Sequence, residues 1–303
     1  MLKKTSHMIF MEGLSEKSAI LKDVIQEQAN EIELEWINQQ EEKLQKNFHL
    51  SSFYLAFSSA PRFIRKKDLQ LNREQLAILA KNHEGIQLEH WDLLQIVRIY
   101  FLLMLPVEDE RSYVRNFERL FETADIEEQV TLYKALPLLP FPEVMVKRTK
   151  EGIRTNITDV FDAIALNNPY PSKFLDQAAW NQMLLKAVFM QRPLFRIYGS
   201  DERANPELSE MLIDFAHERW AANRNVTPEL WRFVGPFMTN THLPDIEKII
   251  GGDYIEKQAG LLACSQSVLP MAQELLSQHP QIKEEIKSGR LNWTIVGEKA
   301  TTV

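Results

Sequence analysis

Apolar residues recur at helical spacing along nearly the whole of this 303-residue chain, and this periodicity restricts the fold more than any other feature. No stretch shows the strict alternation of apolar and polar residues that a half-buried strand requires. The apolar stretches are interrupted at Ala60-Pro61, Leu105-Pro106, Asn168-Pro169 and Gly251-Gly252, which are typical helix ends. The sequence therefore predicts an all-α fold with essentially no β-sheet.

The predicted helices follow one another with short turns between them. Their approximate ranges are 15–46, 72–81, 88–105, 109–122, 126–137, 143–152, 157–168, 174–190, 206–223, 227–236, 244–263, 266–278 and 280–288. Such helices favour a stack of antiparallel pairs, and a curved solenoid-like array is one form that this stack could take. No low-complexity linker interrupts the chain, so we expect one domain over residues 1–303, with subregions 1–140 and 141–303 packed as one body.

Composition narrows the class of function. The net charge of −7 argues against nucleic acid as a partner, because phosphate backbones are bound by clearly basic surfaces. A single cysteine, Cys264, excludes an internal disulfide and lies in an apolar helical context that predicts a buried, inert thiol. None of the seven histidines forms an i, i+4 pair suited to zinc, so we expect no metal site and no cofactor.

The apolar segments also indicate where in the cell the protein is expected. The longest apolar run, Ile96–Leu105, is interrupted by Arg98 and is too short to span a bilayer, so it predicts a buried core helix. The first residues carry two lysines but lack the sustained apolar region of a secretion signal. We therefore expect a cytoplasmic protein without a membrane span.

Basic residues are distributed unevenly. Residues 152–232 hold seven arginines and two lysines, whereas the rest of the chain holds nine arginines and seventeen lysines. Arginine is favoured where a planar fork of donors meets carboxylates, phosphates or carbonyls in a fixed geometry. The segment is not a basic patch, because it also contains ten acidic residues. It therefore indicates an ordered polar interior or a ligand pocket.

Helical spacing places two polar residues of this segment on apolar faces. In the helix expected after Asn205, Arg219 falls within the stripe of apolar side chains, and Asn181 does the same in the helix that contains Trp180. Polar groups on a core face need hydrogen-bond partners, so we expect both side chains to be largely buried and bonded, with a carboxylate as the partner of Arg219. Two interpretations stay open: a buried network that ties helices together, or the wall of a ligand pocket.

Eight ordered motifs resemble the EboA family of bacterial proteins, from about residue 30 to about residue 295. They are AFSSAPR (56–62), ALPLLPFPE (135–143), EGIRTNI (151–157), NPYP (168–171), WNQMLLKAVF (180–189), RANPEL (203–208), AHERWAANR (216–224) and PELWR (228–232). The resemblance implies a place beside a sugar-phosphate-cyclase-like enzyme and a membrane prenyltransferase, in a gene set associated with making or moving a small metabolite. In cyanobacteria that gene set is linked to the export of pigment precursors. The resemblance assigns no reaction.

Three hypotheses of function follow. The first is a non-catalytic protein that binds a polar or anionic metabolite, such as a cyclitol or a sugar phosphate, or that scaffolds other proteins of its pathway. Its candidate ligand-binding residues are Arg154, Asn156, Asn168, Trp180, Asn181, Arg203, Arg219, Arg224, Trp231 and Arg232. The second is an enzyme that uses acid–base chemistry, for which the weaker candidates are His217, Glu218 and Lys186. The third is a purely structural helical interaction protein.

Overall fold

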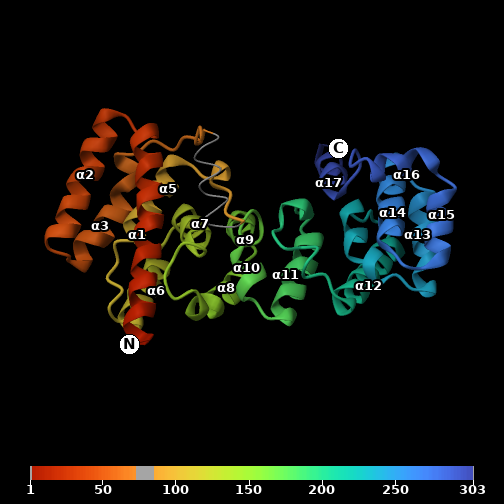
Figure 1. The fold of residues 1–303 in the computed structure, drawn as a ribbon, viewed down its shortest axis with the longest axis horizontal. Helices are drawn as coiled ribbons and strands as arrows, with labels where there is room; N and C mark the ends of the chain where they lie inside the picture. The colour runs from red at the N-terminus through yellow and green to blue at the C-terminus, as the bar shows by residue number, and fades with distance from the viewer. Residues whose placement is uncertain (1, 73–84, 303) are drawn as a thin grey trace. The chain divides into compact units, whose positions relative to one another are not determined.

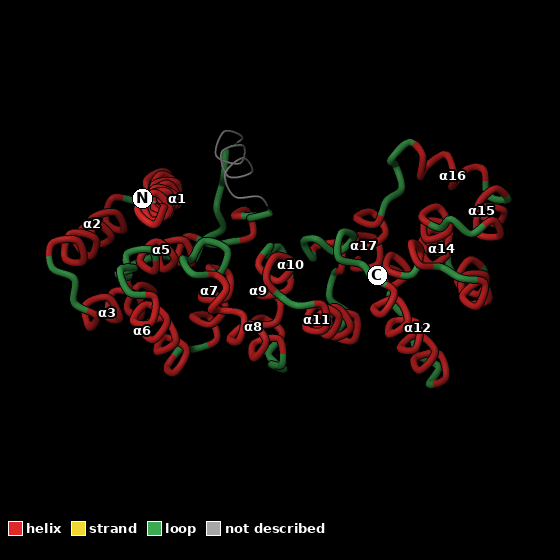
Figure 2. The backbone as a smooth tube through the Cα atoms, turned by 60° about the horizontal axis from the view of Figure 1, so that its bottom comes forward, coloured by secondary structure: helices red, strands yellow, loops and turns green. Residues whose placement is uncertain are grey.

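The computed structural model describes residues 2–72 and 85–302. Within those ranges every regular element is a helix, which confirms the all-α fold, and Figure 2 shows helices and loops only. One isolated bridge joins Asp68 and Asp92 without forming a sheet. The helix expected at 72–81 lies, apart from its first residue, outside the described residues.

The chain divides into two compact units, Met1–Phe174 and Leu175–Val303. The single domain with subregions 1–140 and 141–303 that the sequence suggested stays a prediction. The main helices of the first unit are α1 (Leu2–Gln28), α2 (Glu31–Lys46), α3 (Leu50–Ser59), α5 (Leu93–Leu102), α6 (Glu110–Thr123), α7 (Ile126–Ala135), α8 (Val146–Ile153), α9 (Thr158–Ala165) and α10 (Tyr170–Phe174), with short 3-10 turns at η1 (Ala60–Arg62), η2 (Leu88–His90) and η3 (Pro142–Met145).

Helix α5 forms the core of the first unit, where it packs against α1, α3 and α7. All of its residues except Gln95 are buried, as expected of the longest apolar run. The buried set includes Arg98, whose Nε donates to the Phe57 carbonyl at 3.1 Å and whose Nη2 donates to Glu128 Oε1 at 3.0 Å. This charge is tolerated inside the core because the Phe57 carbonyl and the Glu128 carboxylate accept its hydrogen bonds.

The second unit contains α11 (Gln177–Phe189), α12 (Pro206–Ala221), α13 (Leu243–Ile250), α14 (Tyr254–Gln266), α15 (Pro270–Ser277), α16 (Pro280–Lys287) and α17 (Trp293–Thr302), with 3-10 turns at η4 (Leu194–Arg196), η5 (Pro228–Phe233), η6 (Gly235–Phe237) and η7 (Asn240–His242). Helix α14 is its centre and packs against α13, α15, α16, α17 and η5. Figure 1 shows α14 grouped with α13, α15 and α16. Seven consecutive residues of α14, 258–264, are buried. They include Cys264, whose pKa is raised to about 12 by burial.

Two long predicted helices prove to be pairs. The range 15–46 is divided at Asn30, whose side chain accepts from the Glu33 amide while the Glu33 carboxylate accepts from the Asn30 amide. The range 244–263 is divided by Gly251-Gly252, and Asp253 caps the second helix in the same reciprocal way. Both predictions of one continuous helix were wrong, because a capping box starts a new helix even where the apolar periodicity continues.

Other differences concern short elements. Helices α3, α10 and α17 were not predicted, and the helix expected at 227–236 is formed by the 3-10 turns η5 and η6. Among the described helices, none has both the length and the apolar composition needed to cross a lipid bilayer.

Candidate ligand site between α11 and α12

A pair of asparagines joins α11 to the start of α12. Asn181 Nδ2 donates to Asn205 Oδ1 at 3.2 Å, and Asn205 Nδ2 donates back to Asn181 Oδ1 at 2.9 Å. Asn205 Oδ1 also accepts from the Leu208 amide and so caps α12. The side chain of Asn181 is buried, which confirms the burial predicted from its place on the apolar face. Its bonds hold two helices together.

Arg203 fastens the loop before α12 to the start of α11. Its Nη1 donates to the Leu175 carbonyl at 2.8 Å, and its guanidinium lies 4.8 Å from the centre of the Trp180 ring. Burial lowers the pKa of Arg203, and the nearby carboxylate of Asp176 partly opposes that shift. Trp180 is fully buried, so its ring is part of the core.

Arg232 and Trp231 are likewise engaged within the protein. The Arg232 guanidinium pairs with Asp201 through both Nε and Nη2, the latter at 2.7 Å from Oδ2. Trp231 is buried and stacks on Trp220 with 5.8 Å between ring centres. These contacts agree with the network interpretation of the arginine-rich segment.

Three other candidates belong to the first unit. The buried Asn168 donates to the carbonyls of Tyr133 and Ala163 and accepts from the Tyr170 amide, so its amide group is used in holding its own turn. Arg154 and Asn156 are exposed.

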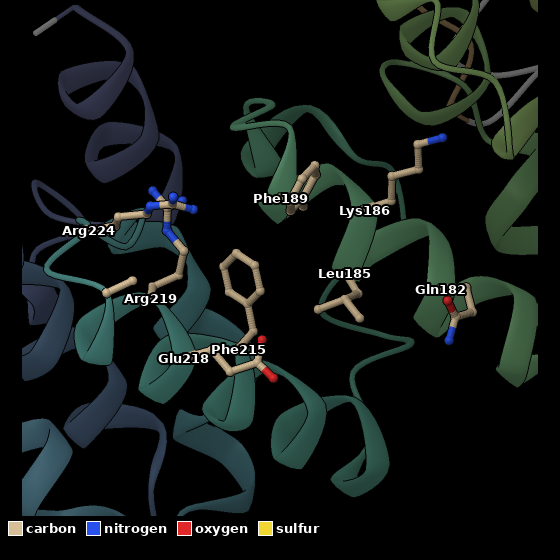
Figure 3. Close-up of a pocket in the computed structure, with 9 residues that line it drawn as sticks. Gln182, Leu185, Lys186, Phe189, Phe215, Glu218, Arg219 and Arg224 are labelled. Carbon is tan, nitrogen blue, oxygen red and sulfur yellow. The ribbon is translucent and has the colours of Figure 1, made fainter.

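The second unit contains a cleft of ≈ 480 Å³ between α11 and α12 (Figure 3). Its lining residues are Gln182, Leu185, Lys186 and Phe189 of α11, Phe215, Glu218 and Arg219 of α12, and Ala222 and Arg224 just beyond α12. On each helix the lining residues are spaced three and four apart, which places them on one face. The sequence prediction missed Gln182, Leu185, Phe189, Phe215 and Ala222, although this spacing could have identified them.

Positive charge exceeds negative charge around the cleft. Lys186, Arg219 and Arg224 line it, together with one carboxylate, Glu218. Arg219 Nε donates to the Asn225 carbonyl at 3.1 Å, but within residues 2–72 and 85–302 no acceptor bonds its two Nη groups. In the same ranges Arg224 forms no side-chain hydrogen bond or ion pair, and Glu218 pairs with neither arginine. Two guanidinium groups at this cleft therefore keep donors for another molecule.

The burial and the hydrogen-bond partner of Arg219 differ from those that the sequence predicted. The side chain is only half-buried, and its partner is a main-chain carbonyl where the sequence suggested a carboxylate. The reason is its position in the last turn of α12, which ends at Ala221. Beyond that point the chain turns back, so Asn225 supplies the acceptor.

The sequence of this chain matches one protein-family model. The model described as "Metabolite traffic protein EboA" matches residues 17–235, a span that contains the whole cleft. The chain belongs to the EboA family. No curated protein and no solved structure gave a significant match.

Two of the three acid–base candidates in this EboA-family chain line the cleft, and the third does not. Glu218 and Lys186 line the cleft, and burial lowers the pKa of Lys186. His217 is not part of the lining: its Nε2 lies 2.8 Å from Asp245 Oδ2 on α13, and its ring lies beside Trp220. His217 thus connects α12 to α13.

Proposed function

We propose that this EboA-family protein binds a polar, anionic small metabolite in the cleft between α11 and α12 and does not transform it. The observation that carries the proposal is the pair Arg219 and Arg224, which line one cleft and keep unused guanidinium donors. Binding without reaction agrees with the family description as a metabolite traffic protein.

Simple electrostatics supports an anion at this place. Two guanidinium groups at one concave surface repel each other, and an anion between them replaces that repulsion by attraction. The planar fork of each arginine can present two parallel N–H donors to a phosphate or a carboxylate. Because the cleft is open to water, the attraction should weaken as salt concentration rises.

The class of metabolite expected from the sequence, a cyclitol or a sugar phosphate, supplies the first ligands to test. Binding of sodium phosphate, sodium sulfate and myo-inositol 1-phosphate would be measured by calorimetry and by thermal shift. We expect the wild type to bind phosphate-containing ligands and Arg224→Ala to weaken that binding about tenfold or more, since one charge-assisted partner is lost.

Arg154→Ala is the matched control, because Arg154 is an exposed arginine of the first unit and does not line the cleft. The control should bind like the wild type. Absence of binding by every anion, or equal loss in Arg154→Ala and Arg224→Ala, would contradict the assignment to this cleft.

One observation favours an enzyme as the second candidate function. Glu218 and Lys186, two groups able to exchange protons, line the same cleft as the two arginines. The two functions differ in the fate of the ligand. Incubation followed by phosphorus and proton NMR should return the ligand unchanged if the protein only binds it, whereas a new product that disappears in Glu218→Gln would establish catalysis.

A further inference from the structure

We infer that the ligand of this cleft combines its anionic group with an apolar ring, so that it is an aryl or similarly hydrophobic phosphate or carboxylate rather than a polyhydroxylated one. The inference rests on the proposed function and adds the chemistry of the ligand's body. The observation behind it is the apolar part of the cleft wall, which the two arginines do not form.

That wall is apolar and contains two aromatic rings. Leu185 and Phe189 come from α11, while Phe215 and Ala222 come from α12 and the residues after it. Phe189 is 69% exposed, although it is a large aromatic side chain at the edge of a concave surface. An aromatic ring left in water beside a cleft gains free energy when an apolar group covers it.

The arginines and the outer apolar residues of the cleft occupy different places, and in Figure 3 the Glu218 carboxylate lies beside Phe215. Figure 3 shows Phe215 between the arginine side chains on one side and Leu185 with Phe189 on the other. In this view the polar ends of Lys186 and Gln182 are directed away from Phe215. A molecule held by the two guanidinium groups therefore extends over phenyl rings.

Hydroxyl groups placed over Leu185 and Phe189, beyond reach of the Glu218 carboxylate, would lose water without gaining partners. Burying a hydroxyl group against an apolar surface without a hydrogen bond is unfavourable, so a cyclitol ring would gain little from Phe189 and Phe215. An apolar ring placed there would stack on, or meet the edge of, the phenyl groups while its anionic group reached the arginines. The volume of ≈ 480 Å³ is of the size that accommodates such a small molecule.

Four probes separate the contributions of ring and anion. Calorimetry would compare phenyl phosphate, myo-inositol 1-phosphate, inorganic phosphate and phenol with the wild-type protein. We expect the Kd of phenyl phosphate to be about tenfold or more below those of the other two phosphates, because only phenyl phosphate covers the aromatic wall. Phenol alone should bind weakly, since it lacks the charge.

Two serine variants test the wall directly. Phe189→Ser should raise the Kd of phenyl phosphate about tenfold and leave that of inorganic phosphate within about twofold of the wild type. Val268→Ser is the matched control, because Val268 is 93% exposed in the same unit and does not line the cleft. Both positions are exposed, so neither change should prevent folding.

The outcomes distinguish this inference from the proposed function. If phenyl phosphate binds no more tightly than inorganic phosphate, if the inositol phosphate binds best, or if Phe189→Ser has no effect, the apolar body is refuted while the anion site stands. If no phosphate-containing probe binds at all, both the inference and the proposed function are refuted.

Discussion

The buried carboxyl group of Glu229 should make the stability of this protein depend on pH. Glu229 is 2% exposed and accepts hydrogen bonds from the amides of Leu194 at 3.0 Å and Phe195 at 2.5 Å. Burial raises its pKa to about 7, although these bonds and the charge of Arg232 act in the opposite direction. Desolvation of the carboxylate is therefore the larger effect.

The sign and size of the effect follow from the two pKa values. In the unfolded chain this carboxyl group has a pKa near 4.5, so between pH 4.5 and 7 the folded protein binds more protons than the unfolded chain. Its free energy of unfolding must then fall as pH rises through that interval. A shift from 4.5 to about 7 corresponds to about 3 kcal/mol at 1.36 kcal/mol per pH unit, and the change ends above the folded pKa.

Glu229→Gln isolates this contribution because it removes the titration and keeps the size of the side chain. Urea unfolding would be followed by tryptophan fluorescence at several pH values between 4.5 and 8, for the wild type, Glu229→Gln and the exposed control Glu274→Gln. Relative to Glu229→Gln, the free energy of unfolding of the wild type and of the control should each fall by about 3 kcal/mol between pH 4.5 and 7.5. Parallel pH profiles for all three proteins would refute the reasoning.

Three further predictions concern packing and charge. Arg98→Ala should lower the free energy of unfolding by about 3–5 kcal/mol because it strands the buried Glu128, and urea unfolding should show most of this loss recovered in Arg98→Met combined with Glu128→Leu. Arg219→Ala should cost only about 1 kcal/mol in the same assay, since this half-buried side chain bonds one carbonyl; a loss as large as that of Arg98→Ala would contradict it. Gly297→Ala should lower stability by about 1–3 kcal/mol in thermal unfolding, because a Cβ there would lie 2.7 Å from the Glu229 carboxyl group, and an unchanged Tm would be inconsistent with that contact.

Much of the fold could be predicted from the sequence, because apolar periodicity and helix-ending residues act locally. The buried run that became α5 and the helix that became α12 were both recognised in this way. The break at Asn30 was missed because the apolar periodicity continues across it, although an asparagine followed three residues later by Glu33 is a capping-box pattern that the sequence already contains. The division after Phe174 depends on packing between distant segments, which periodicity does not report.

The candidate site was predictable only as a region. Excess arginine marked a segment rich in ordered polar contacts, but it did not separate arginines that only bond other parts of the protein from those that also line a cleft. Arg203 and Arg232 meet a carbonyl and a carboxylate, whereas Arg219 and Arg224 retain donors at a cleft. That difference is set by where α12 ends and how the chain turns back.

Helix α12 is both a structural element and one wall of the proposed ligand site. At its start, α12 is fixed by the mutual amide bonds of Asn181 and Asn205, so its first turn cannot move freely against α11. Toward its other end, Phe215 and Arg219 project from the face that lines the cleft, and the bond from Arg219 to a carbonyl beyond the helix orients the guanidinium. A site built on two helices that are joined at one end can hold its side chains in place and stay open at the other. This arrangement agrees with the proposed function, in which the protein binds a small molecule and later releases it unchanged.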